Sequence, residues 1–233
     1  MPSLRFPSDQ AVGTLRWLGS ERAAPMLATG VVTVPDEAEI SLDVMLIESV
    51  RRVDGASRAV HISSRVQVDG PDGPAGCVAE DSESWEITGG TQPVDLGFLR
   101  NLPAGSITGL HLRSPIVPES FPAVAHLAPG LRRLCLACSD LTDDALPTVA
   151  ALRGLVYLQS WGNRFTGTGV QQLASLTRLE HLYLEEETLS AAAFDFAASL
   201  PRLACLGLQD VPLSAAELTE LRQRLPSVDV RWP

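Results

Sequence analysis

The sequence of 233 residues contains no lysine; all 18 of its basic residues are arginine. Asparagine and isoleucine are also scarce, whereas alanine, glycine, proline and arginine abound. We interpret this bias as the codon usage of a GC-rich bacterial genome rather than as a functional feature. The missing lysine still has a chemical consequence, because it excludes mechanisms that use a phosphate-loop lysine, a Schiff-base lysine or a lysine base.

Cysteine and long apolar runs are also in short supply. The four cysteines (Cys77, Cys135, Cys138 and Cys205) are too few in a chain of this length for a disulfide framework. No apolar run approaches the length of a membrane-spanning helix, and residues 1–13 lack the apolar core of a signal peptide. We therefore expect a cytoplasmic protein without a membrane partner.

Basic residues are fewer than acidic ones, 18 against 28, and the net charge is −10. Nucleic acids and anionic membranes are polyanions, so this charge disfavours unspecific binding to either. The apolar content of 45% is ordinary for a globular protein, and the chain is long enough for one large or two small domains. We expect neither nucleic acid nor membrane among the partners.

A 24-residue repeat organises the chain from Ile107 onward. Apolar residues recur at offsets 0, 3, 5 and 10 through four equal steps of 24 residues, and a last step, interpreted as shortened to 22, reaches Leu225, Val228 and Val230. The repeated sets are Ile107, Leu110, Leu112 and Val117; Leu131, Leu134, Leu136 and Leu141; Leu155, Leu158, Ser160 and Phe165; Leu179, Leu182, Leu184 and Leu189; and Leu203, Leu206, Leu208 and Leu213. So regular a period indicates a solenoid.

Each repeat has two parts. Offsets 3 and 5 lie on the same side of an extended strand, which places two leucines in the core. The remainder has helical spacing, as in Leu146, Val149 and Leu152, and this apolar face is expected to pack back onto the sheet. Thr142 and Thr166 stand where N-caps of such helices belong.

Segments such as residues 131–154 resemble leucine-rich repeats, whose pattern is L-x-x-L-x-L-x-x-N/C-x-L. Residues 141–155 are most similar to the ribonuclease-inhibitor-like and cysteine-containing subclasses. The resemblance implies an α/β solenoid with a parallel concave sheet and convex helices. The asparagine or cysteine slot is filled properly only by Asn163, so we predict a weak polar ladder in the turns.

The N-terminal part has a different pattern. Residues 1–80 alternate apolar and polar residues, which predicts three to five short strands in a β-rich cap of the solenoid, and residues 81–233 form the solenoid itself. The loop Asp69–Gly76 is the predicted boundary. Trp85 and Ile87 are candidates for the strand of one earlier repeat, and the charged helix 214–225 for the C-terminal cap.

Strand residues at offsets 2, 4 and 6 are expected to line the concave surface. Offset 2 holds Gly109, Arg133, Tyr157, His181, Cys205 and Ser227; offset 4 holds His111, Cys135, Gln159, Tyr183, Gly207 and Asp229; offset 6 holds Arg113, Ala137, Trp161, Glu185, Gln209 and Arg231. Both tyrosines of the chain fall in these columns, beside a tryptophan. Exposed aromatic residues on a rigid sheet are typical of binding hot spots, although aromatic residues also favour strands by propensity alone.

We predict from these columns a non-enzymatic module that binds a protein or peptide. The predicted contact residues are Tyr157, Trp161, His181, Tyr183, Arg133, Arg113 and Glu185. Arginines gather toward the N-terminal repeats and carboxylates toward the C-terminal ones, which indicates a partner of mixed charge. A homodimer formed through the open edge of the last strand, residues 227–231, is the alternative.

The sequence contains few residues that could form a catalytic or metal-binding site. Cys135 and Cys138, with His111 on the neighbouring strand, are the candidate zinc ligands, but a structural zinc site needs four ligands and only three can be named. Residues 162–167 resemble a phosphate loop without its lysine, and we interpret them as a repeat turn. We expect no cofactor, no metal site and no enzymatic activity.

Overall fold

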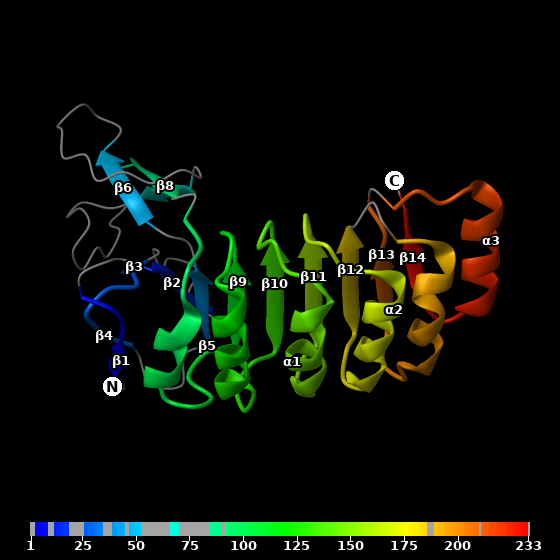
Figure 1. The fold of residues 1–233 in the computed structure, drawn as a ribbon, viewed down its shortest axis with the longest axis horizontal. Helices are drawn as coiled ribbons and strands as arrows, with labels where there is room; N and C mark the ends of the chain where they lie inside the picture. The colour runs from blue at the N-terminus through cyan, green and yellow to red at the C-terminus, as the bar shows by residue number, and fades with distance from the viewer. Residues whose placement is uncertain are drawn as a thin grey trace.

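The computed structural model describes residues 3–8, 12–18, 26–34, 39–44, 47–52, 66–69, 84–89, 92–185, 189–209 and 211–232. Six of its strands form a parallel series: β9 (Gly109–Leu112), β10 (Arg133–Ala137), β11 (Tyr157–Trp161), β12 (His181–Glu185), β13 (Cys205–Gly207) and β14 (Asp229–Arg231). They stand side by side along the long axis of the molecule (Figure 1). The predicted solenoid with a parallel sheet is confirmed.

The register of this sheet is 24 residues throughout. Leu110 pairs with Leu134, and the series continues in the same steps to Leu206, which pairs with Val230. The prediction of a shortened last step is therefore wrong. Val230 occupies the first inward strand position, so Asp229 and Arg231 belong to the columns at offsets 2 and 4. Both Val228 and Val230 are apolar, and the pattern alone could not tell which of them faces the core.

Short helical segments follow the strands. They are η1 (Leu96–Asn101), η2 (Pro118–Leu127), η3 (Asp143–Ala145), α1 (Leu146–Ala151), α2 (Gly167–Val170), η4 (Gln171–Ser175), η5 (Ala191–Ser199) and α3 (Ala215–Arg224), where η marks a 3-10 helix. Their apolar residues, among them Leu146, Val149 and Leu152, are buried against the inward side chains of the strands. The expected helical layer is confirmed, and five of its eight segments are 3-10 helices, which are wound more tightly than α-helices.

Polar side chains in the turns support the stacking of neighbouring repeats. Asn163 donates from Nδ2 to Leu136 O (2.9 Å) and to Ser160 Oγ (3.0 Å), and it accepts from Leu141 N–H (3.2 Å). Ser139, buried in the equivalent position one repeat earlier, donates to Leu112 O (3.3 Å). The polar ladder thus has a second rung that the asparagine-or-cysteine pattern did not predict.

The N-terminal strands extend the same sheet. β5 (Glu39–Val44) pairs in parallel with β9, with Leu42 opposite Leu110, and so takes the place of a repeat strand. β2 (Gly13–Leu18) pairs antiparallel with β5, and β3 (Met26–Leu27) pairs with β2. β1 (Ser3–Arg5) and β4 (Val31–Thr33) form a two-stranded sheet beside them.

The strand predicted around Trp85 and Ile87 does not belong to the solenoid sheet. β8 (Ser84–Gly89) lies between β6 (Ile47–Arg52) and β7 (Val66–Asp69) in a separate antiparallel sheet, so this prediction is wrong. The predicted domain boundary near residue 80 lies outside the described residues.

The C-terminal end is closed by α3. Ser214 accepts at Oγ from Glu217 N–H (3.3 Å), and Glu217 Oε2 accepts from Ser214 N–H (2.8 Å), which together form a capping box. Leu218 and Leu221 are buried, whereas most other residues of α3 are exposed, as suits a terminal cap. None of the helices in the described part of the chain is long and apolar enough to cross a membrane.

Candidate functional site

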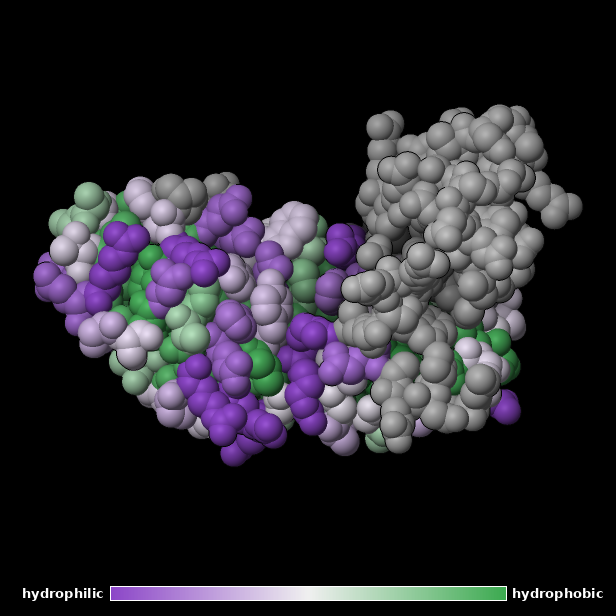
Figure 2. Space-filling view, turned by 180° about the vertical axis from the view of Figure 1, so that it is seen from behind, coloured by the Kyte–Doolittle hydropathy of each residue, from purple (hydrophilic) through white to green (hydrophobic). Residues whose placement is uncertain are grey.

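The sheet register brings together the aromatic residues of β11 and β12. Tyr157 stands opposite His181, Gln159 opposite Tyr183, and Trp161 opposite Glu185. We call the surface formed by these six residues the concave aromatic patch. Figure 2 shows the side of the molecule opposite to that in Figure 1, where hydrophilic side chains cover much of the described repeats and smaller apolar areas lie between them.

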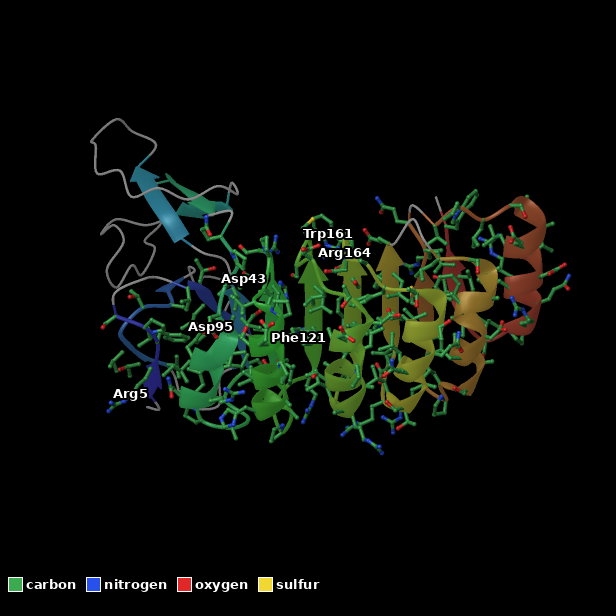
Figure 3. The ribbon with its side chains drawn as sticks, in the orientation of Figure 1. Arg5, Asp43, Asp95, Phe121, Trp161 and Arg164 are labelled. Carbon is green, nitrogen blue, oxygen red and sulfur yellow. The ribbon has the colours of Figure 1, made fainter. Side chains whose placement is uncertain are left out.

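Tyr157 packs its ring against the rings of both Tyr183 and His181. The centroids of Tyr157 and Tyr183 are 5.5 Å apart with an interplanar angle of 36°, and those of Tyr157 and His181 are 6.3 Å apart. Both distances lie in the range of favourable aromatic pairs. Trp161, at the end of β11 (Figure 3), is 38% exposed, so a large apolar ring is available to solvent.

Gln159 is the polar centre of the patch. Its Oε1 accepts from Tyr157 OH (2.9 Å), and its Nε2 donates to Glu185 Oε1 (3.1 Å). Cys135 Sγ on β10 makes a longer contact to the same Oε1 (3.9 Å). Gln159 therefore fixes the positions of a ring and a carboxylate. Its place in the column at offset 4 was the only feature by which Gln159 could be recognised in the sequence.

Tyr183 lies against the backbone of the next strand. A Cβ added at Gly207 would come within 2.2 Å of Tyr183 Cδ1, so the ring covers the space that a side chain would take. Cys205 Sγ lies 3.5 Å from Tyr183 OH and anchors the end of the ring. These two residues of β13 were not among the predicted contact residues.

Burial and hydrogen bonds raise the pKa values of both phenols of the patch and of the neighbouring Cys135 thiol. Burial, with smaller contributions from neighbouring acidic groups, raises the pKa of Tyr157 to about 12. The hydrogen bond with Cys205, together with burial, raises the pKa of Tyr183. Burial also raises the pKa of Cys135, against a smaller lowering effect of Arg113. The phenols therefore act as neutral rings rather than as phenolates.

The predicted arginine contacts are engaged by carboxylates of β5. Arg113 Nε lies 3.4 Å from Asp43 Oδ1, and His111 Nδ1 lies 3.0 Å from the same oxygen. Arg133 Nη2 lies 3.4 Å from Glu39 Oε2. Asp43 is buried near the C-terminal end of β5, opposite His111 of the neighbouring strand β9 (Figure 3). Arg113 and Arg133 thus lie beside the patch, toward the N-terminal end, with their charge balanced.

The candidate zinc ligands do not converge. Cys135 stands opposite His111 as expected from the repeat, but His111 Nδ1 faces Asp43. No group of three or more His, Cys, Asp or Glu residues in the described ranges is arranged to hold a metal ion. Cys135, Cys138 and Cys205 are present as thiols.

A separate pocket of about 250 Å³ opens at the loops that follow the strands. Its apolar wall includes Pro93, Ile116 and Phe121. At its rim Arg164 Nη2 is paired with Asp140 Oδ1 at 2.8 Å, and Figure 3 shows Arg164 near the end of β11. This pocket was not predicted, because its wall is assembled from loops of successive repeats that the strand columns do not include.

Two solved structures are similar to this chain. Internalin C2 from Listeria monocytogenes has 26% sequence identity over 61% of this chain and 60% of that chain, with a TM-score of 0.47. A leucine-rich-repeat protein from Leptospira interrogans has 21% identity over 58% of this chain and 32% of that chain, with a TM-score of 0.40. The aligned part spans less than two thirds of the length of either protein.

No protein-family model and no curated protein sequence matches the chain. The assignment of the fold therefore rests on the chain's own geometry. A constant register of 24 residues, buried leucine columns and a parallel sheet with a helical layer are the features of this fold. The described residues of this part of the chain, 92–185, 189–209 and 211–232, form a leucine-rich-repeat solenoid.

Proposed function

We propose that this chain is a non-enzymatic interaction module that binds a protein or peptide through the concave aromatic patch. The observation that carries the proposal is the contact of Tyr157, Tyr183 and His181 on two adjacent strands, with Trp161 exposed at their end. Tyrosine and tryptophan dominate binding hot spots because they bury a large apolar area and carry a polar group.

The rigidity of the patch supports this function. Gln159 holds Tyr157 and Glu185 by hydrogen bonds, and the backbone of β13 supports the ring of Tyr183. A surface that is already ordered loses little conformational entropy when a partner binds. Such an arrangement favours recognition of a partner over a purely structural role for the aromatic residues.

The proposal is tested by affinity capture from cells of the native host, followed by mass spectrometry. Wild type is compared with the double variant Trp161→Ala/Tyr183→Ala. A control carries Gln172→Ala and Arg178→Ala, two exposed residues outside the concave columns. We expect wild type and control to retain the same partner and the concave variant to lose it. Equal capture by all three proteins would contradict the proposal.

Self-association through β14 is the weaker alternative. The backbone groups of Asp229 and Arg231 bond toward the neighbouring strand, which leaves the carbonyl of Val230 at the open edge. Arg222 Nη2 donates to this carbonyl at 3.0 Å. A capped carbonyl is a poor template for another strand, so we expect light scattering to give the mass of a monomer.

We also propose that the protein works in the cytoplasm. The support is chemical: three cysteines are present as thiols, and one of them, Cys138, is exposed. Exposed thiols persist in reducing compartments and are readily oxidised outside the cell. Localisation of a tagged full-length chain in its native cell tests this proposal.

A further inference from the structure

We infer that the concave aromatic patch accepts a cationic side chain, arginine or lysine, from a peptide segment of the partner. The inference rests on the proposed binding function and adds the chemistry of the ligand. Its basis is the position of one carboxylate among neutral aromatic rings, together with the neutralisation of the arginines that flank them.

The arginines at the N-terminal end of the concave face, Arg113 and Arg133, lie close to carboxylates of β5. Asp43 approaches Arg113 to 3.4 Å and Glu39 approaches Arg133 to 3.4 Å, both from β5. These cations therefore have carboxylate partners within the chain. Both ion pairs are partly exposed, and they reduce the attraction that Arg113 and Arg133 offer to an anionic partner.

Glu185 is the one carboxylate among the six residues of the concave aromatic patch. Its Oε1 accepts a hydrogen bond from the neutral amide of Gln159 at 3.1 Å, and within the described part of the chain no arginine or histidine forms an ion pair with it. Glu185 is half-buried and is held in place by this neutral donor. It can pair with a cation that arrives from outside, and such charge-assisted hydrogen bonds are among the stronger ones.

Aromatic residues of β11 and β12 lie beside this carboxylate. The rings of Tyr157 and Tyr183 lie 5.5 Å apart, and Trp161 stands directly opposite Glu185 in the register of β11 and β12. The negative faces of aromatic rings attract ammonium and guanidinium groups. Aromatic faces can contact the apolar stem of an arginine or lysine side chain, while the carboxylate beside them can pair with its charged end.

The test is selection of random linear peptides displayed on phage against the immobilised full-length chain. The wild type is compared with Trp161→Ala/Tyr183→Ala and with Glu185→Gln, and Glu220→Gln on exposed α3 is the matched control. We expect wild type and Glu220→Gln to enrich peptides in which arginine or lysine exceeds its frequency in the unselected library by about threefold at one position. We expect Glu185→Gln to bind the selected peptide about tenfold more weakly and to lose this preference.

A charge-reversed variant, Glu185→Arg, makes the selection more stringent, because the preferred residue should change from a cation to aspartate or glutamate. Enrichment of peptides by wild type without an excess of arginine or lysine would overturn the cationic ligand while the proposed binding function stands. A failure of wild type to enrich any peptide over the Trp161→Ala/Tyr183→Ala variant would overturn both.

Discussion

Gly207 has no Cβ, and this decides where the ring of Tyr183 can lie. A methyl group at this position would stand 2.2 Å from Tyr183 Cδ1, far inside the contact distance. Because the ring covers backbone on one side and contacts Tyr157 on the other, it has little room to move without leaving the patch. A residue without a side chain is therefore part of the binding surface.

We expect Gly207→Ala to lower the free energy of unfolding by about 1–3 kcal/mol, as overpacking does, and to weaken partner binding. Urea unfolding followed by circular dichroism measures the first effect. The same substitution in a Tyr183→Ala background is the control, since the clash needs the ring. An equal destabilisation in both backgrounds would contradict this explanation.

The two tyrosines also make the patch visible in a pH titration. The chain has only two, and the pKa of Tyr157 is raised to about 12 by burial, from an ordinary value of 10.0. The pKa of Tyr183 is also raised, by its hydrogen bond with Cys205 and by burial. The ultraviolet absorbance of phenolate should therefore appear at higher pH in the folded protein than in urea. Tyr157→Phe should remove the part of the signal that comes from the ring of Tyr157.

The sign of the linked stability change follows from these shifts. Between pH 10 and about 12 the folded chain retains a proton on Tyr157 that the unfolded chain has lost. Folding stability should therefore fall as pH rises through this window, and Tyr157→Phe should reduce that fall. A phenolate signal near pH 10 in the folded protein would show that the rings are not held as described.

Among the elements, a carboxylate of one repeat holds the residue that caps the helix of the next repeat. Asp143 Oδ1 accepts from Thr166 N–H (2.8 Å), and Thr166 Oγ1 donates to Asp143 Oδ2 (2.5 Å). Thr166 Oγ1 in turn accepts from Gly169 N–H (3.1 Å) at the start of α2. Since α2 has only four residues, this cap contributes a large share of its stability.

We predict that Asp143→Ala lowers the free energy of unfolding by about 1–2 kcal/mol, because it removes two hydrogen bonds between repeats. Asp144→Ala is the matched control: this neighbour is exposed, and its loss should change stability by less than about 0.5 kcal/mol. Thermal unfolding of the three proteins under identical conditions gives the comparison. Equal effects of the two substitutions would refute a specific role for Asp143.

The sequence predicted the repeated elements well because their period is constant and nearly every inward position is apolar. The prediction was wrong at both ends of the solenoid, where the repeat pattern is less regular. At the C-terminal end, Val228 and Val230 are both apolar, and the register could be set only by pairing with β13. At the N-terminal end, β5 stands where a repeat strand was expected from Trp85, because alternation predicts strands but does not identify their neighbours.

At the scale of the whole molecule, the N-terminal strands determine the charge of the binding face. β5 places Asp43 and Glu39 beside arginines that lie 70 to 94 residues further along the chain. The aromatic columns of the candidate site could be predicted from the period alone. The ion pairs of these arginines could not be predicted. They depend on the parallel pairing of β5 with β9, and the two segments share no sequence pattern.

The remaining hydrogen-bond network of the site was also beyond sequence reasoning. Gln159 and Gly207 act through contacts with their neighbours, and neither residue type signals a function by itself. Aromatic and charged residues could be selected from the concave columns by their chemistry. The roles of the Gln159 amide and of Gly207 can be recognised only when the distances between neighbouring strands are known.

The proposed function of the concave aromatic patch is to bind a partner. Its most direct test is the dissociation constant of the captured partner, or of the best selected peptide, measured by isothermal titration calorimetry. Three proteins are compared: wild type, Trp161→Ala/Tyr183→Ala, and the control with Gln172→Ala and Arg178→Ala. We predict a rise of at least about 100-fold for the concave variant and no change for the control, while all three unfold within a few degrees of one another. An unchanged dissociation constant in a folded concave variant would contradict the account.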